Sequence, residues 1–296
     1  MPDAAAGAGG PRLCVRKTYK LYVGGAFPRS ESGRSYVVDS SDGRFLANAA
    51  QASRKDVRDA VAAARAAVTG WSGTTAYNRG QVAYRVAEML EGRRDQLAGE
   101  VAAAEGLRAA AAGRQVALSV DRWVWYAGWA DKLAQVAGGL NPVAGPYVNF
   151  SFPEPTGVVG VVAPQGSSLL GLVSVLAPVI VTGNTAVVLA SEGRPLPAVT
   201  LTEVLATSDL PAGVVNVLTG RTAELAPVLA AHRDVDAVDL VGVAPPESVE
   251  LERAAAANVK RVLPPGPAEP DWSVPPSPAR MLAFVETKTV WHPAGT

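Results

Sequence analysis

The chain has 296 residues, of which 48% are hydrophobic and 18% charged, a composition typical of a compact globular protein. Lysine plus arginine equals aspartate plus glutamate at 27 each, so the charge balance gives no reason to expect a nucleic-acid partner. The longest apolar run, residues 169–181, is too short to span a bilayer, and we expect a soluble protein without a membrane partner. A single cysteine, Cys14, excludes an internal disulfide and suits a cytoplasmic location.

The N-terminal region predicts a tail, a short hairpin and a capped helix. The first ten residues lack a basic start and an apolar stretch, so they are not expected to be a secretory signal, and residues 1–16 are predicted to form a flexible tail. Paired glycines at 24–25, between two apolar runs, predict a tight turn. Ser53 and Asp56 match the pattern of an N-terminal capping box, which predicts a helix that ends at Gly70.

Three further helices are predicted before residue 130, at about 77–91, from Arg94 to near Gly106, and around a group of aromatic residues. This aromatic group consists of Trp123, Trp125, Tyr126 and Trp129. We interpret the group as core packing with an interface, because it lacks the basic surroundings that a nucleic-acid stacking platform needs.

The middle of the chain predicts a parallel sheet covered by helices. Residues 145–153 alternate between apolar and polar, as a half-exposed strand does. Continuous apolar runs, typical of strands buried on both faces, then follow at 157–163, 185–189, 213–218 and 235–241. Helical stretches separate them, at 169–181, 198–206 and 222–231. This alternation predicts a doubly wound, Rossmann-type α/β fold.

The C-terminal region changes character after residue 263. Residues 264–279 hold seven prolines, which exclude regular structure and predict an extended linker. Residues 281–291 alternate again, which predicts a last strand that pairs away from the main domain.

Seven phrases stand in the order that the aldehyde dehydrogenase superfamily has, and the chain resembles that family over nearly its whole length. The phrases are YKLYVGGAF at 19–27, KDVRDAVAAARAA at 55–67, YAGWADKL at 126–133, EPTGVVGVVAP at 154–164, LAPVIVTGNTAVVL at 176–189, LPAGVVNVLTG at 210–220 and AAANVKRV at 255–262.

The resemblance implies a cofactor domain over residues 17–140 and 154–263, with the N-terminal helices included. It also implies a small β oligomerisation flap built from residues 141–153 and 280–293. The family's catalytic domain is absent, because the chain runs from residue 263 through the linker to the last strand. In this respect the chain is similar to the second module of tandem aldehyde dehydrogenases, which lacks the catalytic cysteine.

The resemblance further implies that the catalytic groups are missing. The family's nucleophile is a cysteine of the catalytic domain, and Cys14 matches nothing there. Gly166 stands where the family has an asparagine that donates to the oxyanion, and Leu263 with the following prolines replaces the strand of the general base. Neither His232 nor His292 has metal-ligand spacing or an acid–base partner. We therefore predict no catalytic residue and no metal site.

The cofactor prediction is either none or NAD. Ala190 stands where the family has a lysine that bonds the adenosine ribose. The residues that match the family's cofactor-binding positions are Ala163, Pro164, Glu192, Gly220 and Gly242. Glu192 matches after a shift of one residue, and Gly242 keeps the backbone of a turn near the pyrophosphate. Arg221 either contacts a phosphate or, in the interpretation that we favour, is a solvated surface arginine.

Three functions stay open at this stage. The first is a non-catalytic, structural or regulatory subunit of a homo- or hetero-oligomer, because the strands of the oligomerisation flap are retained. Its partner would be a second copy of this chain or a full-length aldehyde dehydrogenase. The second is a nucleotide or metabolite binding module at the loops after Ala163 and Gly220. The third is an NAD(P)-dependent aldehyde oxidoreductase that a partner completes in trans.

Overall fold

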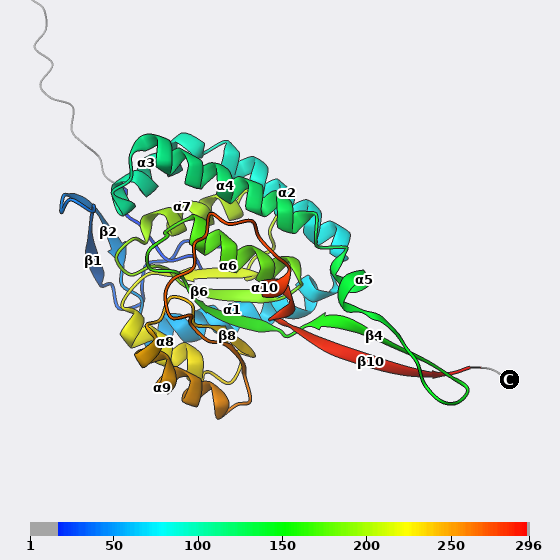
Figure 1. The fold of residues 1–296 in the computed structure, drawn as a ribbon. Coiled ribbons are helices and arrows are strands. Elements are labelled where there is room, and N and C mark those ends of the chain that lie inside the picture. The colour runs from blue at the N-terminus through cyan, green and yellow to red at the C-terminus, as the bar shows by residue number, and fades with distance from the viewer. Residues whose placement is uncertain (1–16, 295–296) are drawn as a thin grey trace, which may run out of the picture.

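The computed structural model describes residues 17–294, and its centre is a five-stranded sheet in which all neighbouring strands are parallel (Figure 1). Its strands are β5 (Val158–Val162), β6 (Thr185–Leu189), β7 (Val215–Leu218), β8 (Ala237–Asp239) and β9 (Arg261–Leu263). In space their order is β7-β6-β5-β8-β9, so the chain builds outward from β5 first on one side and then on the other. This order confirms the predicted doubly wound fold and places its switch point between β5 and β8.

Helices cover both faces of this sheet. One face carries α6 (Leu170–Val181) and α7 (Leu196–Leu205), and the other carries α1 (Arg54–Gly73), α8 (Thr222–Ala231) and α9 (Pro245–Ala256). Side chains along each strand alternate between two hydrophobic clusters, so that Val159 and Val161 of β5 face one layer while Val158 and Val162 face the other. The predicted helices between the strands are confirmed, whereas α9 was not predicted.

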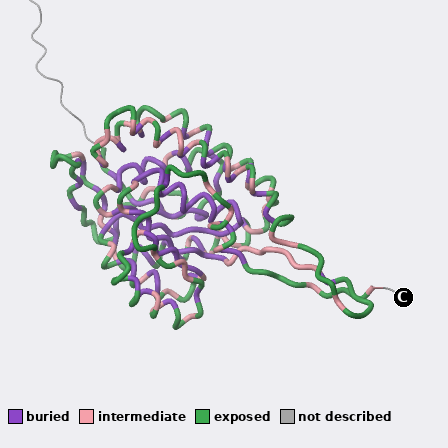
Figure 2. Tube along the Cα trace, in the orientation of Figure 1, coloured by how far each residue is buried: buried purple, intermediate pink, exposed green. Residues whose placement is uncertain are grey.

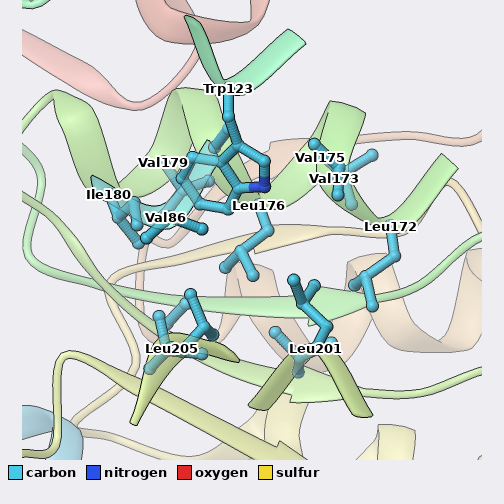
Figure 3. Packing of buried hydrophobic residues seen from close by; sticks show 14 of the residues in the cluster. Val86, Trp123, Leu172, Val173, Val175, Leu176, Val179, Ile180, Leu201 and Leu205 are labelled. Atoms are coloured by element: carbon cyan, nitrogen blue, oxygen red, sulfur yellow. The ribbon is translucent and has the colours of Figure 1, made fainter. Parts of the chain in front are cut away.

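An outer layer of helices covers α6 and α7. It consists of α2 (Ala76–Glu91), α3 (Arg94–Glu105) and α4 (Ala109–Ala127), and α6 is therefore buried along its whole length (Figure 2). The predicted aromatic group lies on and just after α4, and Figure 3 shows Trp123 pointing from α4 towards Leu176 and Val179 of α6. Trp123 and Tyr126 are buried, which confirms the core interpretation for these two residues.

The first long helix begins as predicted but ends later. The Ser53 hydroxyl accepts hydrogen bonds from the backbone N–H groups of Lys55 and Asp56, and the Asp56 carboxylate accepts one from the Ser53 N–H. This capping box confirms the predicted start. The predicted end at Gly70 is wrong, because the helix continues to Gly73. Trp71 is buried and donates from its indole Nε1 to the Ile180 carbonyl at 2.8 Å, which holds the last turn in place.

A flap of antiparallel strands extends from the body of the molecule (Figure 1). After α5 (Leu133–Ala137) it consists of β3 (Gly139–Asn141), β4 (Tyr147–Pro155) and β10 (Val285–Pro293), in the order β10-β4-β3. The last strand therefore pairs away from the main sheet, as predicted. Its predicted start was wrong, because the residues before it form α10 (Ala279–Leu282) and a turn. Met281 and Phe284 are fully buried there and produce the apolar pattern that resembled a strand.

The N-terminal part of the described chain adds a hairpin that was not predicted. Its strands β1 (Ser35–Asp39) and β2 (Phe45–Ala50) pair in antiparallel register. The turn predicted at 24–25 is confirmed by two backbone hydrogen bonds across it. The Leu21 N–H also donates to the Pro28 carbonyl at 3.1 Å, so the predicted short hairpin is present, and Tyr22 within it pairs with Val217 beside β7.

Two further predictions concern the N-terminal tail and membrane-spanning helices. Residues 1–16, with Cys14, lie outside the described residues, so the tail remains a prediction. Among the helices of residues 17–294, none combines the length and the hydrophobicity needed to cross a membrane.

We predict that the substitution Trp123→Ala lowers the free energy of unfolding by about 4 kcal/mol, because it leaves a cavity between α4 and α6. Trp123→Phe should cost less, because the buried indole N–H has no hydrogen-bond partner to lose. Urea denaturation measures both losses. Tyr77→Ala is the control, since that side chain is 63% exposed, and a loss at Tyr77 as large as at Trp123 would contradict the core assignment.

Candidate functional site

A cavity of about 730 Å³ lies at the carboxyl ends of the strands, next to the switch point between β5 and β8. Doubly wound sheets bind their ligands at this place, because the loops after neighbouring strands diverge there. Of the residues predicted to bind a cofactor, Glu192 and Gly242 line the cavity. We therefore treat this crevice as the candidate functional site.

The other predicted residues, Ala163, Pro164 and Gly220, do not line the crevice but lie behind the residues that line it. Ala163 and Pro164 are buried, and a Cβ atom at Gly242 would lie 1.9 Å from the Ala163 carbonyl oxygen, so only glycine fits there. Gly220 is also buried and has a φ of 149°, a conformation that favours glycine. It turns the chain so that Arg221 and the residue after it line the cavity.

Glu192 is held by its neighbours. Its carboxylate forms an ion pair with Arg221 at 2.7 Å and accepts a hydrogen bond from the Thr222 backbone N–H at 2.9 Å. The Tyr36 hydroxyl donates to the Glu192 carbonyl at 3.1 Å, and burial and the Glu192 carboxylate raise the pKa of Tyr36. The Arg221 guanidinium also lies 5.4 Å from the centre of the Tyr36 ring. Arg221 is thus exposed at the surface, as we predicted, and its guanidinium is paired with Glu192.

Gln165 is a residue of the crevice that sequence reasoning missed. Its Nε2 donates to the Ala163 carbonyl at 2.7 Å, and its Oε1 accepts from the Glu192 N–H at 3.0 Å. It therefore joins the loop after β5 to the loop after β6. Its place between Pro164 and Gly166, in the phrase that resembles the family's oxyanion loop, was the available signal.

The proline-rich residues 264–279, which we call the strap, pack across this edge of the sheet instead of forming a free linker. Trp272 in the strap is buried. Arg122 on α4 donates to the carbonyls of Trp272 and Val274 at 2.7 and 2.8 Å, and to the Ser174 hydroxyl at 2.7 Å. The predicted lack of regular structure is confirmed. The strap nevertheless packs against the body, because the buried Arg122 bonds backbone carbonyls of the strap that have no partner in a sheet.

The strap also places a carboxylate on the loop after β5. Glu269 accepts hydrogen bonds from the backbone N–H groups of Gly166 at 2.7 Å and Ser167 at 3.0 Å, and from the Trp272 indole at 3.0 Å. The Glu269 side chain therefore lies where Gly166 has no side chain of its own.

A buried ion pair fixes the end of the strap to the sheet. Asp239 at the end of β8 is fully buried, and Arg280 on α10 donates to its carboxylate. Burial raises the pKa of the Asp239 carboxyl, while Arg280 and a backbone hydrogen bond from Val241 lower it. The Arg280 guanidinium also lies 5.2 Å from the centre of the Trp272 ring, so the ion pair and the strap support each other.

The charges around the crevice do not fit a dinucleotide. The acidic side chains that line it are Asp39, Glu192, Glu247 and Glu269. One basic side chain, Arg221, lines it, and this arginine is already paired with Glu192. A pyrophosphate would therefore meet an excess of negative charge. Within residues 17–294, no group of three or more His, Cys, Asp or Glu residues is placed to hold a metal ion.

The sequence profile of the aldehyde dehydrogenase family matches residues 27–264, and the chain belongs to this family. Cytosolic 10-formyltetrahydrofolate dehydrogenase of Mus musculus is 30% identical over 257 residues, which cover 85% of this chain and 28% of that protein. An aldehyde dehydrogenase of Emericella nidulans is 31% identical over 254 residues, covering 85% of this chain and 50% of its own length. The chain thus spans half the length of these relatives or less.

Solved structures support the same assignment. HpcC from Thermus thermophilus superposes with a TM-score of 0.79 at 30% identity, over 83% of this chain and 47% of that one. An NAD+ complex of an aldehyde dehydrogenase from Bacillus cereus gives a TM-score of 0.78 at 26% identity, over 83% of this chain and 50% of that one. The resemblance seen in the sequence is therefore confirmed, together with the fold that it implied.

We predict that Arg280→Met destabilises the protein by about 3 kcal/mol at neutral pH, because it leaves the Asp239 carboxylate buried without its partner. Without Arg280 the folded-state pKa of Asp239 rises further above its unfolded value. The folded state then binds a proton more tightly than the unfolded state, and stability falls as the pH rises between those two pKa values. The loss in the variant should therefore be smaller at pH 5 than at pH 8.

Urea denaturation at both pH values measures this difference, with Arg253→Met as the matched control. Arg253 forms an exposed ion pair with Glu250, and its loss should matter little. Equal losses in the two variants, or a loss at Arg280 that is larger at the lower pH, would contradict the buried pair.

Proposed function

We propose that this chain is a non-catalytic member of the aldehyde dehydrogenase family that acts as a structural or regulatory subunit of a cytoplasmic oligomer. The partner that we propose is a full-length aldehyde dehydrogenase, whose own flap would pair with this one. The observation that carries the proposal is the flap of β3, β4 and β10, which extends into solvent with large apolar side chains exposed on it.

The exposed surface of the flap favours a protein partner. Its apolar side chains are exposed by 77%, 46%, 45% and 59% for Leu140, Tyr147, Val148 and Trp291. The rings of Tyr147 and Trp291 contact each other at 5.9 Å, so they form one aromatic surface. Figure 2 shows that the flap remains largely exposed or half-exposed along its length. The strand register places Tyr147 and Trp291 on one face of the ribbon and Leu140 and Val148 on the other, so both faces expose apolar side chains, which favours association.

The backbone of the flap supports the same proposal. Within the described residues β10 is an edge strand, and its outer backbone groups have no strand beside them. A narrow antiparallel ribbon is marginally stable by itself in water, because neither of its faces is covered. A strand from another subunit would satisfy these groups and bury the aromatic surface.

The chemistry of the described residues supports a non-catalytic role. Residues 17–294 contain no cysteine, so they supply no thiolate for attack on an aldehyde. Gly166 offers a backbone N–H in place of a side-chain donor, and that N–H is bonded to Glu269. The strap leads from β9 to α10 and β10 across the edge where a catalytic domain would otherwise join.

We predict that the tagged chain, isolated from the cells that produce it, carries a full-length aldehyde dehydrogenase in a fixed ratio. Native mass spectrometry identifies the partner and gives the stoichiometry. Trp291→Ser should weaken the complex by about tenfold or more, because buried aromatic residues contribute most to such interfaces. The control is Tyr84→Ser, which removes an aromatic side chain that is 49% exposed on α2, outside the strands of the flap.

The oxidation rate of the complex separates the subunit role from the trans-completed enzyme. In the proposed role, the partner alone reduces its coenzyme. The presence of this chain changes the assembly or the regulation of the partner and adds no catalytic group. A stable monomer that ignores full-length relatives would contradict the proposal. A complex whose activity requires a catalytic contribution from this chain's crevice would favour completion in trans.

A further inference from the structure

The strap forms the wall between two cavities. Its residues 266–269 line the crevice of about 730 Å³ described above. Residues 269–273 line a second cavity of about 510 Å³, whose opposite side is formed by α4 and the start of α6. Glu269 lines both cavities, so its position determines whether they are separate.

Glu269 occupies backbone donors that suit an external anion. Two consecutive N–H groups, at Gly166 and Ser167, point at its carboxylate, with donor–acceptor distances of 2.7 and 3.0 Å. They lie in the loop just before α6, where the helix dipole also favours negative charge. The next N–H, at Ser168, is bonded to Glu105 at 2.7 Å. Three consecutive backbone donors of this loop are thus used by carboxylates of the chain itself.

The absence of a side chain at residue 166 makes room for this contact. A Cβ atom at Gly166 would lie 3.0 and 3.2 Å from the two carboxylate oxygens of Glu269. A Cβ atom at this position would therefore press on the carboxylate, which would have to shift by a few tenths of an ångström. The backbone at Gly166 does not have a positive φ, so its conformation does not require glycine. The close approach of Glu269 is therefore the contact that favours glycine at this position.

The strap has other anchors that do not depend on Glu269. Arg122 bonds the carbonyls of Trp272 and Val274, and the Arg280–Asp239 ion pair holds the segment that follows. Glu269 itself is exposed to solvent. The residues around Glu269 can therefore leave the loop while the rest of the strap stays packed.

We propose that the strap is an autoinhibitory element in which Glu269 takes the place of an external anion on the Gly166 and Ser167 N–H groups. These two residues line the second cavity, so the carboxylate closes that cavity to anionic ligands. The removal of this carboxylate frees the two donors and lowers the negative charge of both cavities. The proposal concerns these cavities, and it holds or fails independently of assembly through the flap.

The test compares the wild-type chain with Glu269→Ala and Gly166→Ala, using inorganic pyrophosphate as the anionic probe. Hydrogen exchange reports the Gly166 and Ser167 amides in wild type and in Glu269→Ala. In the second variant, only the Ser167 amide is followed. Exchange at both amides should accelerate by about tenfold in Glu269→Ala, because they lose a charged acceptor, and less at Ser167 in Gly166→Ala, where the carboxylate only has to shift. The Ser168 amide, bonded to Glu105, is the internal control and should not change.

Pyrophosphate should slow the exchange of these amides in Glu269→Ala in a saturable way and leave them unchanged in the wild type. Acetate should do the same more weakly, since it returns the carboxylate that the substitution removes. Glu250→Ala, which removes an exposed carboxylate of α9, is the matched control and should behave as the wild type. The proposal is overturned if pyrophosphate affects the wild type as strongly as Glu269→Ala, or if it affects neither.

Discussion

The strap lies against the carboxyl edge of the doubly wound sheet, and buried polar contacts hold it there. Arg122, buried under the strap, bonds two of its carbonyls, while Asp239 at the end of β8 is neutralised by Arg280. These contacts satisfy polar groups that would otherwise be buried without partners, at a cost of several kcal/mol each. Because β10 follows the strap, the same contacts also determine where the flap leaves the body.

The strap links the two features of the molecule that bear on function. On one side it lines the crevice and adds the Glu269 carboxylate to a surface that is already acidic. On the other side it leads into β10, which forms the flap with β4 in a continuous register. In the role that we propose, the family fold keeps the flap for assembly while the charge of its crevice opposes a dinucleotide, since the two features are supported by different contacts of one segment.

Much of the fold could be predicted from the sequence, because its strands are buried on both faces and its helices carry local start signals. Residues 158–162 and 185–189 are continuous apolar runs, and Ser53 with Asp56 forms a cap within four residues. The packing of the strap could not be predicted in this way. The bonds from Arg122 to Trp272 and from Gly166 to Glu269 join residues that are 150 and 103 positions apart. Prolines indicate the absence of regular structure, but they do not indicate whether a segment packs.

The crevice could be predicted only in part, because some of its contacts also join loops that are distant in the sequence. The resemblance to the family identified Glu192 and Gly242, which line the cavity, and Ala163, Pro164 and Gly220, which support it. It did not indicate that Arg221 and Glu192 pair with each other, because that contact depends on how two loops meet. Gln165, which joins these loops through its side-chain amide, was missed for the same reason.

The most direct test of this account is the titration of the wild-type chain with NAD in an isothermal calorimeter, with a full-length aldehyde dehydrogenase measured beside it. The account predicts saturable heat for the full-length enzyme and none for this chain up to millimolar NAD, because the acidic crevice and Glu269 oppose the pyrophosphate. Saturable binding of one NAD per chain at micromolar concentration would contradict the account and would identify the crevice as a working dinucleotide site.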